Sequence, residues 1–258
     1  MSNLIIIAGG GKFGEKAVLF ARKKNFSAIL IDKDFNCYAS KFIDEKLDIN
    51  TLQNLDVNYF KAKKIYFLNT DISIILELIE KFKPYYIIPV IPIHLLAEII
   101  KLFFSKNYIR LNSDDTSTEA FFIKADKNII LNYIKEKAVV YLSYAKVNEI
   151  CPDNCSGPLK YCPNFKREKP ISISSYLKNY FEAKDVIKII KKDFIKIMIL
   201  AESYQLMPGL GGLKGKHIKM IIDTLNKSIN SLLKVSFKCI IATTCNCHGV
   251  INFFENNH

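Results

Sequence analysis

The strongest constraint on the fold is the order of apolar residues and glycines at the start of the chain. The stretch LIIIAGGGKFGEKAVLFARKKNFSAILIDKD begins at Leu4, and its first apolar run ends at three consecutive glycines. An amphipathic pattern follows from Lys12, and a second apolar run ends at Asp32. This order predicts a strand, a tight glycine turn, a helix and a second, parallel strand.

The glycines of this turn have the spacing G-x-G-x-x-G, filled by Gly9, Gly11 and Gly14. In a dinucleotide site these positions provide the tight turn, the close approach to a pyrophosphate and the close contact of helix and strand. The helix from Lys12 would direct its free N–H groups at the phosphates. Asp32 has the spacing expected for an acid that binds the ribose hydroxyls, which favours NAD over NADP.

The same residues carry a family resemblance. IIIAGGGKFGEKAVLFARKKNFSAILIDKD resembles the nucleotide-binding domain of the TrkA-type regulators of potassium transport (TrkA-N). GGGK is also similar to the dehydrogenase domain of siroheme synthesis, although FGEK departs from the valine and arginine usual there. Both families have Rossmann domains, so the resemblance implies a nucleotide ligand, NAD(P), for about the first forty residues.

Alternation of strand and helix patterns continues after this unit. Strands are expected at 63–70 and 85–92, and helices at 72–82 and 93–104. Such alternation favours a parallel sheet with its ligand at the carboxyl ends of the strands. His94 follows one of these ends, where it is a candidate proton donor or acceptor beside a nicotinamide. A histidine that merely caps a helix is the alternative.

The second half predicts a further α/β unit. A helix is expected near 117–136, a strand at 138–147 and a helical stretch at 172–192. Two strands, 194–201 and 237–243, flank a glycine-rich segment and a helix, so their carboxyl ends should meet at one edge of a sheet.

The glycine-rich segment, PGLGGLKG, contains Gly211 and Gly212. As a loop before a helix it would hold an anion, whereas a flexible connection is the other interpretation.

The alternation of strands and helices in both halves predicts an α/β fold class. A Rossmann-like parallel-sheet domain (1–110) is followed by a second, smaller α/β domain (111–258) with a cysteine-rich metal-binding loop.

Cysteines cluster in the second half, as CPDNCSGPLKYCP (Cys151, Cys155 and Cys162) and CNCH (Cys245, Cys247 and His248). Disulfides are disfavoured in a reducing compartment and by the odd number of cysteines, 7. Turn residues between irregularly spaced cysteines, with a remote fourth donor, suit an iron–sulfur cluster. Zinc remains the alternative, although its sites usually pair two short knuckles.

One of the two distal cysteines would remain if the other completes the metal site. Cys247, with His248 beside it, is then a candidate nucleophile, and a packed thiol is the alternative. Cys37 and Cys239 lie in apolar surroundings and are predicted to be core residues.

Charge and hydropathy argue against two classes of partner, specific nucleic acids and membranes. The formal net charge of +12 comes almost entirely from Lys, since the arginines are Arg22, Arg110 and Arg167. Because Arg is preferred for planar recognition of phosphates and bases, its scarcity argues against specific nucleic-acid binding. No apolar run is long enough to cross a bilayer, and the start lacks the order of a secretory signal. We therefore expect a cytoplasmic protein without a membrane span.

These patterns together predict an NAD(P)-binding redox protein with an iron–sulfur cluster or zinc, and with oxidoreductase activity on a small-molecule or anionic substrate. A redox partner protein and a homodimer are candidate partners. The rival hypothesis is a TrkA-N-type regulator that senses a nucleotide and the redox state or a metal without turnover.

Overall fold

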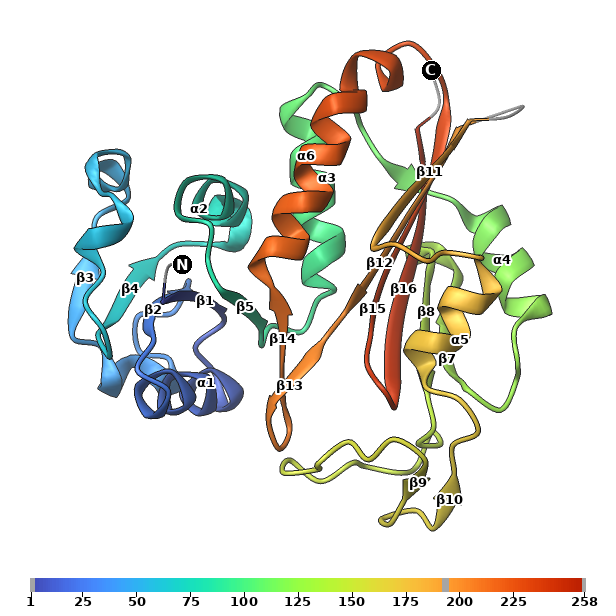
Figure 1. Cartoon of the computed structure of the whole chain (residues 1–258), viewed down its shortest axis with the longest axis horizontal. Helices are drawn as coiled ribbons and strands as arrows, with labels where there is room; N and C mark the ends of the chain where they lie inside the picture. Colours follow the sequence, from blue (N-terminus) through green and yellow to red (C-terminus); the bar gives the residue numbers. More distant parts are fainter. Residues whose placement is uncertain (1–2, 192–194, 257–258) are drawn as a thin grey trace. The chain divides into compact units, whose positions relative to one another are not determined.

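The computed structural model describes residues 3–191 and 195–256, and the chain divides into two compact units. Unit 1 comprises 1–95 and 204–219, and unit 2 comprises 96–203 and 220–258. Each has a sheet that contains parallel strands and carries helices, so the fold is mixed α/β (Figure 1).

Unit 1 is built from nine strands and helices and four short 3-10 turns. Its strands and helices are β1 (Leu4–Ala8), α1 (Lys12–Lys23), β2 (Ser27–Asp32), β3 (Glu45–Leu47), β4 (Ile65–Asn69), α2 (Ile75–Phe82), β5 (Tyr86–Pro89), β13 (Tyr204–Met207) and β14 (Leu210–Lys214). The 3-10 turns are η1 (Tyr38–Phe42), η2 (Ile49–Asn54), η3 (Val57–Tyr59) and η4 (Ile72–Ile74).

The unit 1 sheet has the order β13-β14-β5-β1-β2-β4-β3, and its strands from β5 to β3 are parallel. Every residue of β1 is buried, as expected of a central parallel strand covered on both faces. The α1 and α2 helices cover opposite faces (Figure 1). The strands and helices predicted between 4 and 106 are confirmed, with small shifts at their ends.

The prediction of a glycine-rich loop at 208–215 is wrong. PGLGGLKG belongs to a β-hairpin in which β13 pairs with β14, and β14 pairs antiparallel with β5. Pro208 and Gly209 form the turn, and Gly209 has φ of 72°, which the third position of a type II turn requires. Gly211 and Gly212 are therefore strand residues, and a Cβ on Gly212 would collide with Leu206.

Unit 2 contains the remaining elements. They are α3 (Leu95–Lys106), β6 (Asn112–Ser113), α4 (Asp115–Lys124), β7 (Ile130–Ile134), η5 (Lys135–Lys137), β8 (Val139–Ser143), β9 (Tyr161–Cys162), β10 (Arg167–Glu168), α5 (Ile173–Tyr180), β11 (Ile187–Lys191), β12 (Ile195–Glu202), α6 (Gly215–Leu232), β15 (Phe237–Thr244) and β16 (His248–Asn256). The first residue of α3 and the first turn of α6 are grouped with unit 1.

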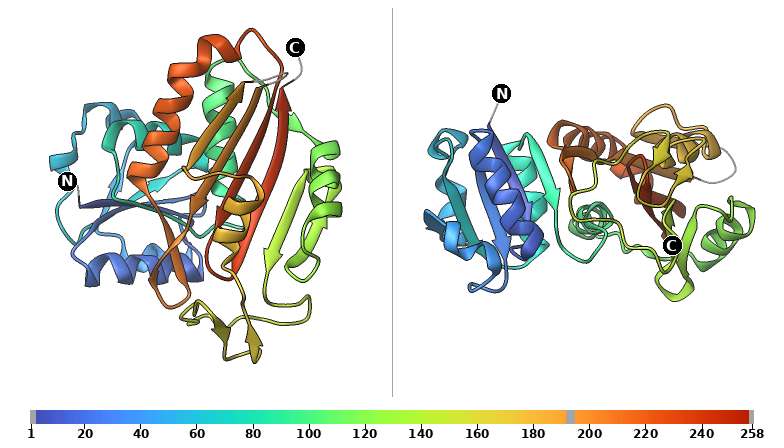
Figure 2. Two further views of the ribbon diagram at one scale, coloured as in Figure 1. Left: turned by 45° about the vertical axis from the view of Figure 1, so that its right-hand side comes forward. Right: turned by 90° about the horizontal axis from the view of Figure 1, so that it is seen from below.

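The unit 2 sheet has the order β11-β12-β15-β16-β8-β7, and β6 also pairs with β16. The strands β12 and β15 are parallel, as predicted, and Glu202 lies opposite Thr244. Both views in Figure 2 show α3 and α6 on one face of the sheet and α4 and α5 on the other. A core of buried side chains, among them Phe121, Leu177 and Phe253, joins α4 and α5 to the sheet.

Two sequence-based predictions in unit 2 are wrong, and one strand was missed. The helix expected over 117–136 ends at Lys124, and β7 follows. The helical stretch expected over 172–192 ends at Tyr180, and Ile187–Lys191 is strand β11. Residue 192 of that prediction, and residue 194 of the strand expected over 194–201, lie outside the described residues. The last strand, β16, was not predicted. In each case pairing with a neighbouring strand, β8, β12 or β15, decides the structure of a short apolar segment.

The division into units also differs from the predicted boundary at 110. The α3 helix packs into unit 2, where Phe104 stacks near Phe237 with ring centroids 5.2 Å apart. The β13–β14 hairpin, in turn, completes the edge of the unit 1 sheet. Unit 2 therefore holds more residues than unit 1, contrary to prediction. Across the described ranges of the chain, no helix combines the length and apolar character that a membrane span needs.

A buried ion pair anchors α4 to the unit 2 sheet. Asp114 is 2% exposed, accepts a hydrogen bond from the Ser117 amide at 2.9 Å, and lies 2.9 Å from the Lys238 ammonium. Burial alone would raise the pKa of Asp114, but the hydrogen bonds of Ser117 and Lys238 outweigh burial and hold it below its ordinary value. The carboxylate thus supplies both a helix cap and a charge partner.

We expect Asp114→Ala to lower the free energy of unfolding by roughly 2–4 kcal/mol at neutral pH, because the cap and the ion pair are both lost. Asp114→Asn keeps a capping oxygen and should lose less. Since the folded-state pKa is depressed, this contribution is present at neutral pH and disappears as the pH falls through that value. Urea titrations at pH 7 and pH 3 test this, and an undiminished difference in acid would contradict it.

Candidate functional site

The glycine turn of unit 1 has two glycines that the fold itself requires. Gly9 has φ of 109°, and a Cβ there would lie 2.8 Å from the Val90 carbonyl oxygen. A Cβ on Gly14 would collide with the carbonyl oxygen of Gly9, so α1 can approach β1 closely only because this residue is glycine. Packing therefore explains both positions without a ligand.

Gly11 is different. Its φ of −66° suits any residue, and a Cβ built there meets nothing within 4 Å. It also occupies the N-cap of α1, where no side chain caps the first turn. Neither backbone conformation nor packing thus requires a glycine at this position, although glycine is a common N-cap residue.

The acid at the end of β2 lies beside this turn. Oδ2 of Asp32 accepts a hydrogen bond from the Gly10 amide at 2.5 Å, and Oδ1 accepts one from the Asp34 amide at 2.8 Å. Cys37 is buried, as predicted, and a Cβ on Gly10 would strike its sulfur. Burial raises the pKa of the Cys37 thiol, and the nearby charge of Asp32 adds to this effect.

His94 lies between β5 and α3 and is partly exposed. The turn that precedes it borders the glycine turn, because Val90 and Ile91 are the residues that a Cβ on Gly9 would meet. The structure thus brings the segment with His94 near the predicted nucleotide turn. Gly211 and Gly212 instead pair within the sheet of unit 1.

In unit 2, the two cysteine segments lie at the same end of the sheet. After β8 the chain forms a long loop, 144–160, which leads into the short β9–β10 hairpin below the sheet in Figure 1. In this hairpin Cys162 pairs with Arg167. The second segment, 245–248, is the turn and first residue of the β15–β16 hairpin, and His248 lies opposite Ser143 at the end of β8.

Three side-chain contacts join the loop to this turn. They are His248 Nε2 with Cys151 Sγ at 3.5 Å, the Asn246 side-chain amide donating to the Gly157 carbonyl at 3.1 Å, and Cys247 Sγ donating to the Pro158 carbonyl at 3.8 Å. Sulfurs separated by about ninety residues in sequence are thereby neighbours, because β16 pairs with both β15 and β8. The parallel pairing of β12 and β15 instead predicts that the PGLGGLKG segment lies beside this turn, but that segment belongs to the sheet of unit 1.

The sulfurs of this cluster receive hydrogen bonds from N–H groups. The Gly157 amide donates to Cys155 at 3.3 Å, and the His248 amide donates to Cys245 at 3.4 Å. Cys247 accepts a hydrogen bond from the Lys169 ammonium at 2.9 Å. Such donors stabilise negative charge on sulfur, and they accompany metal-bound thiolates.

The pKa values of this cluster show that its members interact. Burial raises the pKa of Cys151, and the charges of the other four thiols add to that, beginning with Cys155 and Cys162. Burial likewise raises the pKa of Cys245. Although His248 keeps some exposure, desolvation of its ring and then the charge of Lys169 lower its pKa. With their pKa values raised, Cys151 and Cys245 stay protonated at neutral pH unless a bound cation displaces the proton.

Among residues 3–191 and 195–256, no three His, Cys, Asp or Glu side chains are placed tightly enough to enclose an ion. His248 lies between two of the cysteines: it contacts Cys151 through Nε2 and Cys245 through Nδ1 at 3.9 Å. Cys155 and Cys162 lie within electrostatic range of Cys151. The structure therefore gathers all the predicted ligands in one region without arranging them as a closed coordination shell.

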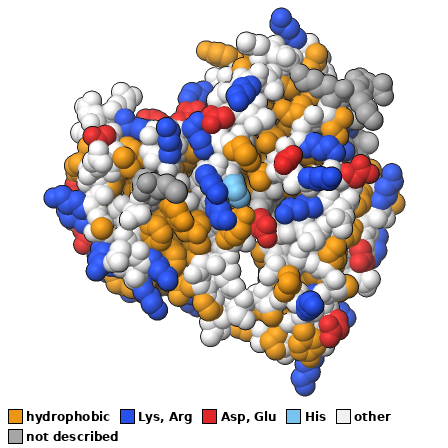
Figure 3. Space-filling view, in the orientation of Figure 1, with side chains coloured by type: hydrophobic (Ala, Val, Ile, Leu, Met, Phe, Trp, Pro, Cys, Tyr) orange, Lys and Arg blue, Asp and Glu red, His pale blue; other side chains and the backbone are white. Residues whose placement is uncertain are grey.

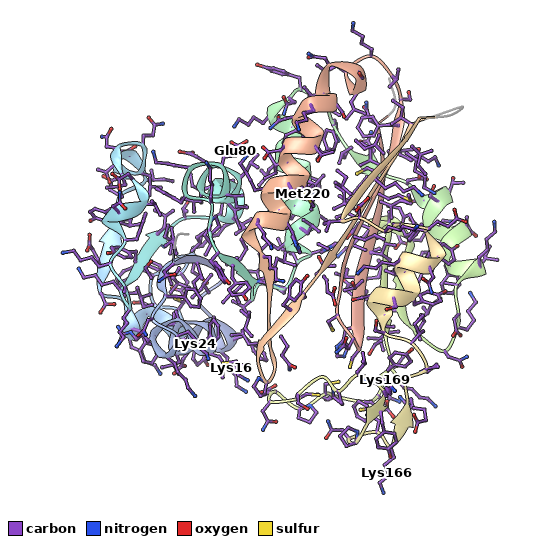
Figure 4. All side chains as sticks on the ribbon, viewed as in Figure 1. Lys16, Lys24, Glu80, Lys166, Lys169 and Met220 are labelled. Carbon is purple, nitrogen blue, oxygen red and sulfur yellow. The ribbon has the colours of Figure 1, made fainter. Side chains whose placement is uncertain are left out.

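Two basic residues of this region were missed by sequence analysis. Lys169 is only 3% exposed and contacts Cys247. Arg167 holds Glu149 through two hydrogen bonds of 2.8 Å and also donates to the Tyr144 carbonyl. In the sequence these residues belong to the run FKREKP, which is typical of a solvated surface segment, so no local signal indicated their burial. Figure 4 shows Lys169 at the end of the sheet, whereas Lys166 points away from it.

Comparisons with known proteins agree with this division of the chain. A family model described as "Uncharacterized protein, C-terminal domain" (AF_1314_C) matches residues 96–257. The chain belongs to this family. The companion model, "Uncharacterized protein, N-terminal domain", matches residues 4–95, so the two models meet where units 1 and 2 divide.

A protein of Archaeoglobus fulgidus described as "Uncharacterized protein" is similar to this AF_1314_C-family chain. The two are 28% identical over 246 residues, which are 95% of this chain and 96% of that protein. No solved structure matches the chain significantly.

The Arg167–Glu149 pair should hold the cysteine loop in place. The guanidinium lowers the pKa of Glu149 to about 2, which reflects a bidentate ion pair. We expect Arg167→Ala to increase chymotrypsin cleavage at the exposed residues Leu159 and Tyr161 by about fivefold or more, because local opening of the loop becomes easier. The matched control is Lys166→Ala, which removes a neighbouring exposed charge, and equal cleavage of the two variants would contradict this role.

Proposed function

We propose that this protein is a redox protein that binds NAD(P) in unit 1 and holds an iron–sulfur cluster on cysteine thiolates in unit 2. The observation that carries the proposal is the meeting of the 151–162 loop with the 245–248 turn. It gathers Cys151, Cys155, Cys162, Cys245 and Cys247 at one end of a sheet. A chance arrangement of thiols would not also supply their sulfurs with N–H donors.

The donor set fits a sulfur-ligated centre. Cys155 and Cys245 accept backbone N–H groups, an arrangement that tunes the potential of iron–sulfur clusters. Cys162 pairs with Arg167 in the β9–β10 hairpin, which places it on a regular element rather than in a free loop. Three thiolates would then come from the loop and hairpin, and the fourth from Cys245 or Cys247. The cluster, when bound, supplies one-electron transfer or polarisation of a substrate.

Zinc is the second candidate, and one distance favours it. Sulfur and nitrogen ligands of tetrahedral zinc, at about 2.3 and 2.0 Å from the metal, lie about 3.5 Å from each other. Cys151 Sγ and His248 Nε2 are 3.5 Å apart. In that arrangement His248 would take the role of a ligand, and the centre would be structural or would act as a Lewis acid.

In unit 1, Gly11 is the residue that gives evidence for a nucleotide ligand. A glycine that neither backbone nor packing requires is expected where a ligand occupies the space that a Cβ would take. The order of the parallel strands β5, β1, β2 and β4 supports a Rossmann-type domain, with the glycine turn at the carboxyl end of β1. In this proposal the first turn of α1 binds phosphate, and Asp32 binds the ribose while it holds the turn.

The roles of His94, Cys247 and His248 in turnover remain predictions. His94 would exchange a proton beside the nicotinamide, and the substrate would be a small molecule or anion. The alternative function, a TrkA-N-type sensor of nucleotide and metal or redox state, uses the same two sites without turnover.

Figure 3 shows Lys and Arg side chains scattered among acidic ones on the visible face, without the single basic stripe that nucleic-acid binding favours.

The metal centre can be tested by cysteine replacement after purification without oxygen. We expect wild-type protein to absorb broadly near ~400 nm and to contain matching iron and sulfide. Cys151→Ser and Cys155→Ser should each lower bound metal by about tenfold or more, because a ligand is lost. Cys239→Ala is the control, since Cys239 is fully buried in β15. If the wild-type protein is colourless and contains stoichiometric zinc, the centre is a zinc site and not an iron–sulfur cluster. If it contains neither metal, the proposed metal site is refuted.

The nucleotide site can be tested by adding one methyl group. We expect Gly11→Ala to lower the free energy of unfolding by no more than about 1 kcal/mol, because the new Cβ meets open space and alanine is only a poorer N-cap than glycine. It should weaken NADH binding, followed by fluorescence, by about tenfold or more. Gly14→Ala provides the converse control, since its Cβ collides with Gly9 and the fold itself should suffer. Unchanged NADH affinity in Gly11→Ala would defeat this placement.

A further inference from the structure

Lys169 poses an electrostatic problem that the protein residues around it do not solve. The residue is 3% exposed, although its side chain ends in an ammonium group. Its hydrogen bond goes to the sulfur of Cys247, at 2.9 Å. A neutral thiol is a weak acceptor, and a buried ammonium without an anion is strongly unfavourable. Lysines in such positions are normally paired with a carboxylate or lose their proton.

The neighbouring charges do not include such a carboxylate. Within the described part of the chain, Lys169 forms no ion pair, and Glu149 of the cysteine loop is paired with Arg167. The groups that respond to the Lys169 charge are instead members of the cysteine cluster. Its charge acts on Cys245 and His248, although burial is the main cause of both shifts and leaves the pKa of Cys245 raised. The ammonium therefore faces sulfur and imidazole rather than an acid.

The β9–β10 hairpin holds Lys169 in this position. The backbone amide of Lys169 donates to the Lys160 carbonyl at 2.7 Å, which extends the ladder by one residue beyond the pairing of Glu168 with Tyr161. Lys160 itself is exposed, on the opposite strand. One lysine of this pair thus points to solvent and the other into the cysteine cluster, although both lie in the same short ladder.

We propose that Lys169 is the internal counter-ion of the metal centre in unit 2 and that it acts through the sulfur of Cys247. This inference rests on the proposed function. A centre with four thiolate ligands is an anion for zinc and for the usual oxidised iron–sulfur clusters, so it provides the negative charge that Lys169 lacks. Lys169 is a positioning residue in this scheme, because it contacts a ligand sulfur or its neighbour and not the metal.

The proposal predicts opposite effects in the loaded and the metal-free protein. In the metal-free protein Lys169 is a buried cation without a full anion, so Lys169→Met should raise the melting temperature. In the loaded protein the same substitution removes the counter-ion, so it should lower the melting temperature and speed metal loss to EDTA by at least about tenfold. A lysine that serves packing alone would shift both states in the same direction.

An iron–sulfur cluster allows a second measurement. One-electron reduction, with dithionite as the electron source, adds one negative charge to the cluster, and the ammonium stabilises that charge. Lys169→Met should therefore lower the reduced-to-oxidised ratio at a fixed ambient potential by at least about tenfold, which for one electron is about 59 mV toward negative potential. Lys169→Arg keeps the charge and should restore the wild-type ratio. Lys160→Met, the exposed lysine across the ladder, should leave melting, metal loss and potential unchanged.

The outcomes separate this inference from the proposed function. If Cys151→Ser loses the metal but Lys169→Met retains it as firmly as wild type, the inference is wrong and the metal centre stands. Shifts of the same sign in metal-free and loaded Lys169→Met protein would also overturn it. If wild-type protein binds neither iron nor zinc, the metal centre fails and the counter-ion role fails with it.

Discussion

The position of β16 between β15 and β8 is the constraint on which the unit 2 site depends. Its antiparallel pairing with β15 places the 245–248 turn at the end of the sheet. Its pairing with β8 sets His248 opposite Ser143, where the chain leaves the sheet to form the cysteine loop. Because strand register is discrete, a shift by one residue would turn His248 to the other face and separate the two cysteine segments.

Electrostatics then gives this region its chemical character. Burial and then the charges of neighbouring thiols raise the pKa of Cys151, and N–H groups and one buried ammonium donate hydrogen bonds to sulfurs of the cluster. A neutral hydrophobic cluster would need none of these donors. Such donors would stabilise negative charge on sulfur if a bound cation displaced the thiol protons, as the proposed metal centre requires.

Unit 1 contains one motif glycine that folding does not require. Gly9 and Gly14 satisfy the backbone and the contact of helix with strand, so their presence follows from packing. Gly11 satisfies neither demand. The hydrogen bond from the Gly10 amide to Asp32 ties the acid of β2 to the same turn, so one local unit joins the features associated with nucleotide binding.

Much of the architecture was predictable, because local patterns carry it. The apolar runs and glycines of residues 4–34 led directly to β1, α1 and β2, and the parallel pairing of β12 with β15 followed from strand and helix alternation. Failures occurred where a short apolar segment has no period long enough to distinguish helix from strand. Ile187–Lys191 is a strand because β12 offers it a partner. The PGLGGLKG segment likewise became a hairpin because β5 had a free edge.

The candidate sites, like the fold, were predictable only in part. The sequence by itself determined which side chains are available: the thiols of two segments, the glycines and Asp32. Only the tertiary structure decided that Lys169 is buried against Cys247, that Arg167 clamps Glu149, and that Gly11 alone among the motif glycines faces open space. The physical reason is that burial and charge pairing depend on residues distant in the chain, whereas a local pattern records only the preference of each segment for its own conformation.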